Sequence, residues 1–340
     1  MPNRVFWAGQ GLAINTTVKA LHEPAAADAV NVRGIQSVGI TTTFNLEQVF
    51  QLGQLTVYED VEDIPDIEIT VERVLNDDKS LYTLTGAVSG NSLTQNQDKT
   101  FDVYFEVHND ATENIDDDGG FPAAQAHCSG LYVSSMSWTF PTDGNCTESF
   151  TFVGNGKKWQ SGSTVASTYD TDGIPTVVGE AKVWRRQQVE LETIPTSVNN
   201  MDSTPKVMSA SVSIDLGREA INVLGKKLPY YRYVTFPVEV TCELEVLVRD
   251  AYSATDKMAD GINAVPDPGA GSGSNVTAES IKIKGTGREA GGYTKEWNLG
   301  DKNKLTGVTW GGGSTGGENA TVTFSYRNFN DFTYTETVVS

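Results

Sequence analysis

Hydrophobic and polar residues alternate along two segments of the chain, 66–74 and 238–246. In each, one side is apolar, formed by Ile67, Ile69 and Val71 in the first and by Val238, Val240 and Cys242 in the second. The other side is polar, formed by Glu68, Thr70 and Glu72 and by Glu239, Thr241 and Glu243. A period of two is typical of a strand with one buried and one wet face, as in antiparallel sheets. The pattern therefore predicts a mainly β fold.

The two segments belong to a longer repeat. Gly225 lies 172 positions after Gly53, and four further pairs keep this offset: Glu47 and Glu219, Leu52 and Leu224, Pro65 and Pro237, Trp138 and Trp310. A constant offset over so long a stretch predicts two copies of one module. We expect an N-terminal arm (1–33), a first module (34–154), a connector (155–206) and a second module with a C-terminal tail (207–340).

Each copy shows the same succession of expected elements. A strand (38–42 or 210–214) is followed by a short helix (46–52 or 218–224), which a left-handed glycine, Gly53 or Gly225, would end. The proline then starts the alternating strand. A hairpin closes the first copy (131–140 and 147–153), and the second copy turns through the glycines of 311–317 and returns through 320–326. The predicted fold class is two tandem antiparallel β-sandwich or barrel modules, each with one short helix.

Charge limits the classes of partner. The formal net charge is −19 and the pI is near 4.5. Proteins that grip nucleic acid need basic patches that neutralise phosphates, and the densest charge runs here are acidic: Glu59, Asp60, Glu62 and Asp63, and Asp116, Asp117 and Asp118. Two interpretations remain open for these acids: a solubilising surface, or a surface that must not retain DNA.

Candidate chemistry is sparse. His22, His108 and His127 share no metal-ligand spacing, and no nucleophile elbow, phosphate loop or dinucleotide motif is present. The acidic stretches 114–119 and 170–173 fit turns better than calcium loops, because neither is followed by a suitably spaced glutamate. We therefore expect no enzyme activity, no cofactor and no bound metal.

Other features concern the compartment. No apolar run is long enough to span a membrane, and the first residues lack the layout of a secretory signal, so we expect folding in a cytoplasm. In that setting Cys128 and Cys146 stay reduced, although the sequence leaves a link between them open. Cys242 is expected to be a small buried residue within a strand.

The repeated residues also carry a family resemblance. The segments 224–233 (Leu-Gly-Lys-Lys-Leu-Pro-Tyr-Tyr-Arg-Tyr) and 236–243, together with 35–40 and 46–55, resemble tail tube proteins of tailed bacteriophages, including virion structural proteins of cyanophages. The resemblance implies two packed antiparallel sheets in each unit and inner strands that pair from unit to unit around a channel. It also implies stacked rings through which the genome passes, a location in the virion tail after assembly in the host cytoplasm, and a sheath, baseplate and terminator as further partners.

Tubes of this family usually have six single-unit subunits in a ring. With two units in one chain, three chains would make a pseudo-six-fold ring, which we favour over six chains. The acids at 59–63 and 116–118 are then candidates for the channel wall or for contacts between rings. Alternatives are a tail terminator, a baseplate hub or the tube of an injection device. A different class is a tandem carbohydrate-binding module, which Trp7, Trp159, Trp184 and Trp297 would support if they were exposed.

Overall fold

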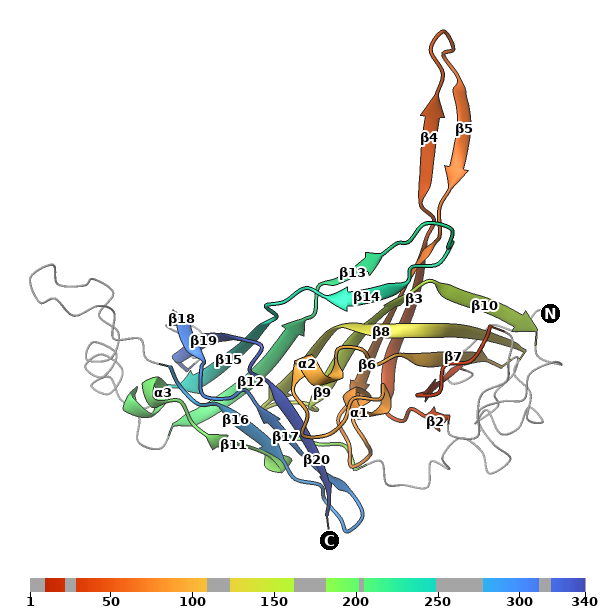
Figure 1. The fold of residues 1–340 in the computed structure, drawn as a ribbon. Helices are drawn as coiled ribbons and strands as arrows, with labels where there is room; N and C mark the ends of the chain where they lie inside the picture. The colour runs from red at the N-terminus through yellow and green to blue at the C-terminus, as the bar shows by residue number, and fades with distance from the viewer. Residues whose placement is uncertain are drawn as a thin grey trace, which may run out of the picture.

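The computed structural model describes residues 10–21, 29–108, 123–161, 182–201, 205–248, 278–311 and 319–339. The fold is mainly β, as predicted, and its antiparallel sheets pack face to face around one continuous hydrophobic core (Figure 1). Below, the strands β1 to β10 are called the first half and β11 to β20 the second half.

Eight strands form the largest antiparallel sheet, here called the front sheet, in the order β3-β6-β9-β8-β12-β15-β19-β18. Their bounds are β3 (Ile35–Thr43), β6 (Asp66–Val74), β8 (Ala124–Pro141), β9 (Thr147–Gly154), β12 (Lys206–Asp215), β15 (Glu239–Leu247), β18 (Lys304–Gly311) and β19 (Thr321–Phe329). The hairpin of β8 and β9 and the alternating faces of β6 and β15 confirm the predictions, because the apolar positions of both strands are buried.

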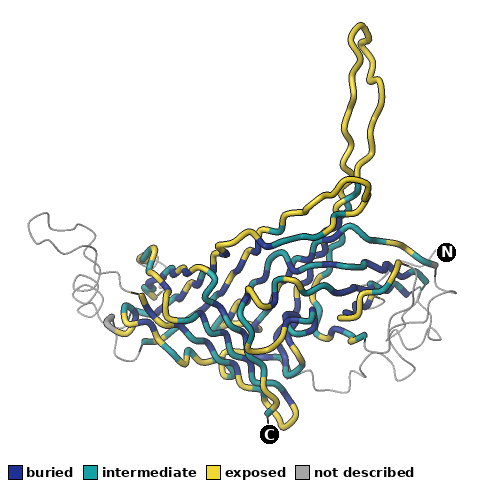
Figure 2. The backbone as a smooth tube through the Cα atoms, in the orientation of Figure 1, coloured by how far each residue is buried: buried dark blue, intermediate teal, exposed yellow. Residues whose placement is uncertain are grey.

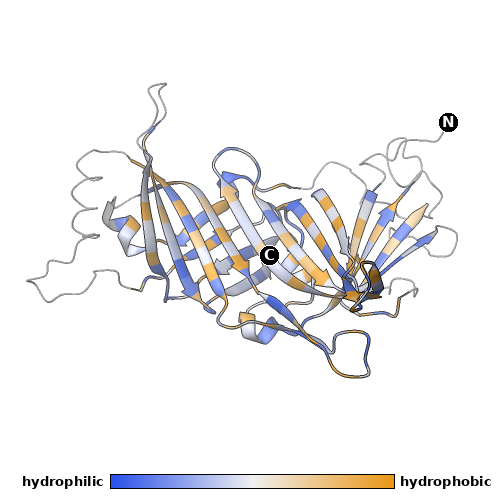
Figure 3. Cartoon of the chain, turned by 90° about the horizontal axis from the view of Figure 1, so that it is seen from above, coloured by the Kyte–Doolittle hydropathy of each residue, from blue (hydrophilic) through white to orange (hydrophobic). Residues whose placement is uncertain are grey.

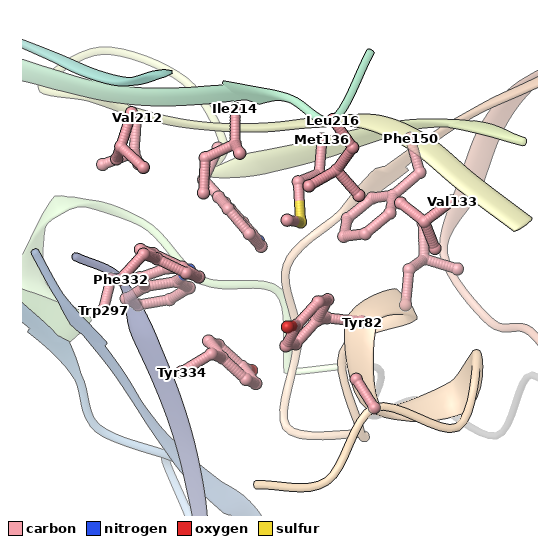
Figure 4. Packing of buried hydrophobic residues seen from close by; sticks show 14 of the residues in the cluster. Tyr82, Val133, Met136, Phe150, Val212, Ile214, Leu216, Trp297, Phe332 and Tyr334 are labelled. Carbon is pink, nitrogen blue, oxygen red and sulfur yellow. The ribbon is translucent and has the colours of Figure 1, made fainter. Parts of the chain in front are cut away.

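Two smaller sheets cover the buried face of the front sheet. The first contains β10 (Gly156–Ser161), the N-terminal part of β8, β7 (Phe101–Val107), β1 (Gln10–Asn15) and β2 (Val30–Asn31). The second contains β11 (Val189–Thr193), β16 (Lys282–Gly285), β17 (Tyr293–Asn298) and β20 (Thr333–Val338). Phe101 packs edge-on against Phe152 at 4.8 Å, and Figure 4 shows Trp297, Phe332 and Tyr334 opposite the front-sheet side chains. Parts of the expected arm and connector thus supply β1, β10 and β11.

The predicted helices at 46–52 and 218–224 are wrong. These residues form β-hairpins, β4 (Leu46–Phe50) with β5 (Val57–Glu62) and β13 (Arg218–Ile221) with β14 (Tyr231–Val234). Gly53 and Gly225 have positive φ values of 93° and 80°, as expected, but they lie in the connections between hairpin strands. The helices within the described residues are short: α1 (Leu81–Leu84), α2 (Leu93–Asn96), α3 (Thr196–Met201) and the 3₁₀ helix η3 (Arg186–Gln188).

The two halves match in strand order and in irregularities. Bulges interrupt β3 between Ile35 and Ser37 and β12 between Val207 and Ser209, and they recur in β8 at 133–135 and in β18 at 305–307. Matching the bulges and the strand pairings gives each residue of these strands a counterpart in the other half. The counterpart lies 172 positions later for β3, β4, β5 and β8, 173 positions later for β6 and 174 positions later for β9. That the halves arose by duplication, and where the modules begin and end, stay predictions.

Candidate assembly surfaces

The front sheet is continuous across the two halves. Its centre is the pairing of β8 with β12, which runs from Pro141 opposite Ser209 to Ser135 opposite Asp215. Its two ends are β3 and β18, and within the described part of the chain each of these pairs with a strand on one side only. β3 is the counterpart of β12, and β18 is the counterpart of β8. The open edges of β3 and β18 therefore correspond to the two edges that pair with each other at the centre of the sheet.

The tryptophans at matching places on β8 and β18 differ in burial. Trp138 on β8 is fully buried, and its ring stacks on Phe332 and Tyr334 at centroid distances of 5.7 and 6.1 Å. Its counterpart on the open edge, Trp310, keeps 47% of its surface exposed. Trp310 is therefore a large apolar side chain at an unpaired sheet edge, a position that monomeric proteins usually protect.

The solvent face of the front sheet is lined mainly by small hydroxyl side chains and by acids, and it also carries the bases Lys304 and Arg327. Its acids within the described residues are Asp66, Glu68, Glu72, Asp215, Glu239, Glu243 and Glu245. Between them lie Ser135, Ser137, Thr139, Ser149, Thr151, Ser211, Ser213, Thr323 and Ser325. Figure 3 shows the alternation of hydrophobic and hydrophilic positions along the strands. Two matching hydrogen bonds hold acids in place, Ser37 to Glu72 at 3.3 Å and Ser209 to Glu245 at 3.0 Å.

The β4–β5 hairpin projects away from the body of the protein, and all its strand residues are exposed (Figures 1 and 2). The predicted site residues Glu47, Glu59, Asp60 and Glu62 lie on its strands. Leu52 and Leu55, in the connection between the strands, are fully exposed. No Lys or Arg occurs between Gly34 and Glu72, so this hairpin is both acidic and apolar. Exposed apolar side chains grouped on a projection are typical of a contact surface.

The β13–β14 hairpin has shorter strands, carries bases and lies on the first half. Arg218 donates to the Val133 carbonyl at 2.9 Å, and its guanidinium lies 5.0 Å from the centre of the Tyr132 ring. Arg232 donates to Asp66 Oδ1 at 2.6 Å and to Asn155 Oδ1 at 2.9 Å. The two arginines thus attach this hairpin to the ends of β8, β6 and β9.

A buried ionic cluster ties the front sheet to the second covering sheet. Arg73 on β6 and Glu148 on β9 are opposite one another, with Arg73 Nε 3.1 Å from Glu148 Oε1 and both side chains almost completely buried. Lys295 on β17 is also fully buried and donates to the Asn76 carbonyl at 2.8 Å. Burial, and then the charge of Arg73, lower the pKa of Lys295 to about 8 from its usual 10.5.

The lowered pKa of Lys295 predicts a pH dependence. The unfolded chain binds a proton at this lysine up to about pH 10.5 and the folded chain only up to about pH 8, so stability rises with pH in that interval. Wild type is expected to gain on the order of 2 kcal/mol relative to Lys295→Met between pH 8 and pH 10. Urea unfolding of both proteins at several pH values measures this difference. A difference that stays constant with pH would contradict the assignment.

The other predicted site residues have different outcomes. Glu219, Leu224 and Gly225 belong to the β13–β14 hairpin. Pro65 directly precedes β6 and Pro237 lies two residues before β15, close to the strand starts at which they were predicted. Asp63 follows β5 and binds the Ile64 amide at 2.7 Å. Asp116, Asp117 and Asp118 lie outside the described residues, as do Trp7 and the 170–173 turn. The acids on the solvent face of the front sheet were not singled out as a site, although their alternation is visible in the sequence.

The expected exposure of the aromatic side chains is partly wrong. Trp184 and Trp297 are fully buried, whereas Trp159 on β10 is 49% exposed. Lys295 Nζ lies 4.9 Å from the centre of the Trp184 ring, and Trp297 packs against Trp138 and Phe140 of the front sheet. All three cysteines are free and buried, and Cys242 lies within β15 as predicted. In the described part of the chain no three His, Cys, Asp or Glu side chains come together as metal ligands, and no helix is long and apolar enough to cross a membrane.

Comparisons with known proteins give little. No family model matches the chain, and no curated protein matches it. Among solved structures, a chain from the cryo-electron microscopy structure of the anti-feeding prophage (AFP) baseplate, six-fold symmetrised, is similar over 47% of this chain and 98% of its own, with 10% identity and a TM-score of 0.34. A likeness this distant shows neither the function nor the assembly of this protein.

Proposed function

We propose that this protein is a structural subunit of a phage-related tail or injection device, and more specifically a tail tube subunit that closes into rings around a channel. The observation that supports the proposal is the front sheet, whose two open edges are counterparts of the edges that pair at its centre. Head-to-tail contacts of this kind close into rings or continue as filaments, and closure removes the open edges.

The central pairing supplies the register of the contact between copies. If β18 of one copy meets β3 of the next as β8 meets β12, Trp310 lies opposite Ile40 and Thr309 opposite Thr41, just as Trp138 lies opposite Val212 and Ser137 opposite Ser213. The solvent face of the front sheet then becomes the channel wall. Its acids repel phosphate, so DNA passes as cargo without being retained.

The remaining parts of the proposal concern partners and place. Three chains give a pseudo-six-fold ring, rings stack into a tube, and a sheath, baseplate and terminator are the further partners of such a tube in the virion tail. A terminator, a baseplate hub or an injection-device tube would use the same edges. Of these proteins, only a tube subunit would form stacks of rings with no fixed number of rings. The carbohydrate-binding alternative loses its main support, because Trp184 and Trp297 are buried.

Charge pairs placed across the proposed contact test it. Thr41 and Thr309 are exposed, so changing them leaves the fold intact. Like charges directly opposite in a sheet are destabilising and opposite charges stabilising. The variant Thr41→Asp with Thr309→Asp is therefore expected to stay monomeric at concentrations where Thr41→Lys with Thr309→Asp forms rings. Sedimentation velocity and negative-stain microscopy of both variants and of wild type measure this, and mass photometry counts the chains in a ring.

The result has two clear forms. Rings or tubes of the wild type, lost with two aspartates and recovered with the lysine–aspartate pair, support the closure and its register. A wild type that remains monomeric at every concentration and salt overturns the proposed function.

A further inference from the structure

The β13–β14 hairpin shows how a hairpin of this protein docks on the half before it. The β4–β5 hairpin is its counterpart in the first half, and the pairing of Leu46 with Glu62 corresponds to that of Arg218 with Val234. Within the described residues no half of the chain lies against the β4–β5 hairpin, and the residues of both its strands are exposed (Figure 2). A second copy of the chain can supply a half on which it would dock.

The place where the β13–β14 hairpin docks has a distinct counterpart on the second half. In the chain, Arg218 and Tyr231 both contact Tyr132, which is opposite Val153 at the ends of β8 and β9. The counterparts of Tyr132 and Val153 are Lys304 and Arg327, which are likewise opposite one another at the ends of β18 and β19.

Two bases directly opposite one another form a positive spot at this rim. Like charges in such a pair repel. Arg327 Nη1 lies 3.8 Å from Glu239 Oε1, and both side chains are about half exposed. The counterpart of Tyr231 on the β4–β5 hairpin is Glu59, which is opposite Val49 as Tyr231 is opposite Ile221.

We propose that the β4–β5 hairpin of one copy docks on the rim of the second half of a neighbouring copy, with Glu59 against the pair of Lys304 and Arg327. The proposal rests on the proposed function, because it needs the ring contact that brings the two halves together. Within the chain the hairpin carries the bases Arg218 and Arg232 and the first half carries the acid Asp66, whose counterpart on the second half is Glu239.

Exposed apolar side chains accompany these charges on both sides. Leu46 and Val49 on the hairpin are 59% and 38% exposed, and Phe329 at the end of β19 is 48% exposed. The Lys304–Arg327 pair also bears on which hairpin docks here. A basic hairpin on this pair would bring like charges together, and such pairs select against wrong partners.

A charge exchange tests the docking. Glu59→Lys and Lys304→Glu, each alone, are expected to raise the concentration needed for half of the protein to form rings by about tenfold, because an attraction becomes a repulsion. The double variant Glu59→Lys with Lys304→Glu is expected to return to within about threefold of the wild type, since the pair is restored with opposite polarity. Sedimentation velocity at low salt measures each concentration, and salt at about 0.5 M should narrow the differences.

Glu47→Lys is the matched control. It makes the same charge change on the same hairpin, but its counterpart Glu219 stays exposed in the docked hairpin, so ring formation should match the wild type. If Glu59→Lys forms rings as readily as wild type, or if the double variant does not recover, the docking is wrong while ring closure stands. If the wild type does not associate at all, both the docking and the proposed function are wrong. Circular dichroism of each variant checks that the fold is kept.

Discussion

Replacing Glu148 by Gln is expected to lower the free energy of unfolding by about 3–5 kcal/mol, because it removes the anion from a buried ion pair and leaves cations uncompensated. Glu148 Oε1 lies 3.1 Å from Arg73 Nε, and Oε2 accepts from Ser80 Oγ at 2.6 Å and from Trp138 Nε1 at 3.3 Å. Lys295, also fully buried, adds a second cation to the cluster.

Urea unfolding followed by tryptophan fluorescence measures this loss. Glu68→Gln is the matched control, since Glu68 is an exposed acid on the strand that carries Arg73, and surface changes of this kind stay within about 0.5 kcal/mol. An unfolding free energy of Glu148→Gln equal to that of the control would show that the cluster does not need its anion.

The second half shows what this cluster replaces. The counterparts of Arg73 and Glu148 are Val246 and Val322, which are opposite one another and fully buried. An apolar pair therefore satisfies the same place in the sheet, in line with the small net gain expected from buried ion pairs. In the first half, Glu148 also makes contacts beyond its ion pair with Arg73. Glu148 accepts from the Leu81 amide at 3.1 Å, which fixes the start of α1, and Trp138 between Glu148 and Tyr334 links the front sheet to β20.

Much of the front sheet could be predicted from the sequence, because burial on one face imposes a period of two. Ile67, Ile69 and Val71 on β6 and Val240 and Cys242 on β15 are buried as expected. The repeat also located the matching strands. The offset of 172 does not hold throughout, however, since counterparts in β6 and β15 are 173 apart. A shift of one residue exchanges the faces of a strand, so this detail follows from pairing and not from alignment.

The hairpins could not be predicted from the same signal. Both faces of β4 are exposed, so no alternation is required, and Leu46, Val49 and Phe50 have the spacing of a helical face. What makes this segment a strand is its pairing with β5 across the connection that contains Gly53. Local spacing gave the wrong element because the deciding contact is with a partner strand.

The candidate assembly surfaces were only partly visible in the sequence. The acidic neighbours of Glu59 predict it as a candidate site residue, but its relation to Lys304 depends on the register of four pairs of strands and has no local signal. The predicted exposure of Trp297 is wrong for a related reason. Trp297 belongs to a polar stretch, and it is buried because β17 packs against Trp138 and Phe140, at ring distances of 6.1 and 4.8 Å.

The counterpart tryptophans lead to the other large expected effect. Trp138→Ala should lower the free energy of unfolding by about 3–5 kcal/mol, since it empties a fully buried site between two sheets. Trp310→Ala should leave the unfolding free energy of the monomer within about 1 kcal/mol of the wild type, because the side chain is half exposed at an edge. Its effect should instead appear in association, where the ring contact would bury it beside Ile40 of the next copy.

Chemical unfolding below the assembly concentration and sedimentation velocity above it separate the two effects. Trp159→Ala is the control, because Trp159 is the same residue type and 49% exposed, but it lies on β10, which pairs with β8 in the first covering sheet. Wild-type ring formation by Trp310→Ala would mean that the β18 edge is not the contact between copies. A loss of rings with an unchanged unfolding free energy of the monomer would show that the two counterparts have different roles. Trp138 would stabilise the fold within a chain, and Trp310 would join one chain to the next.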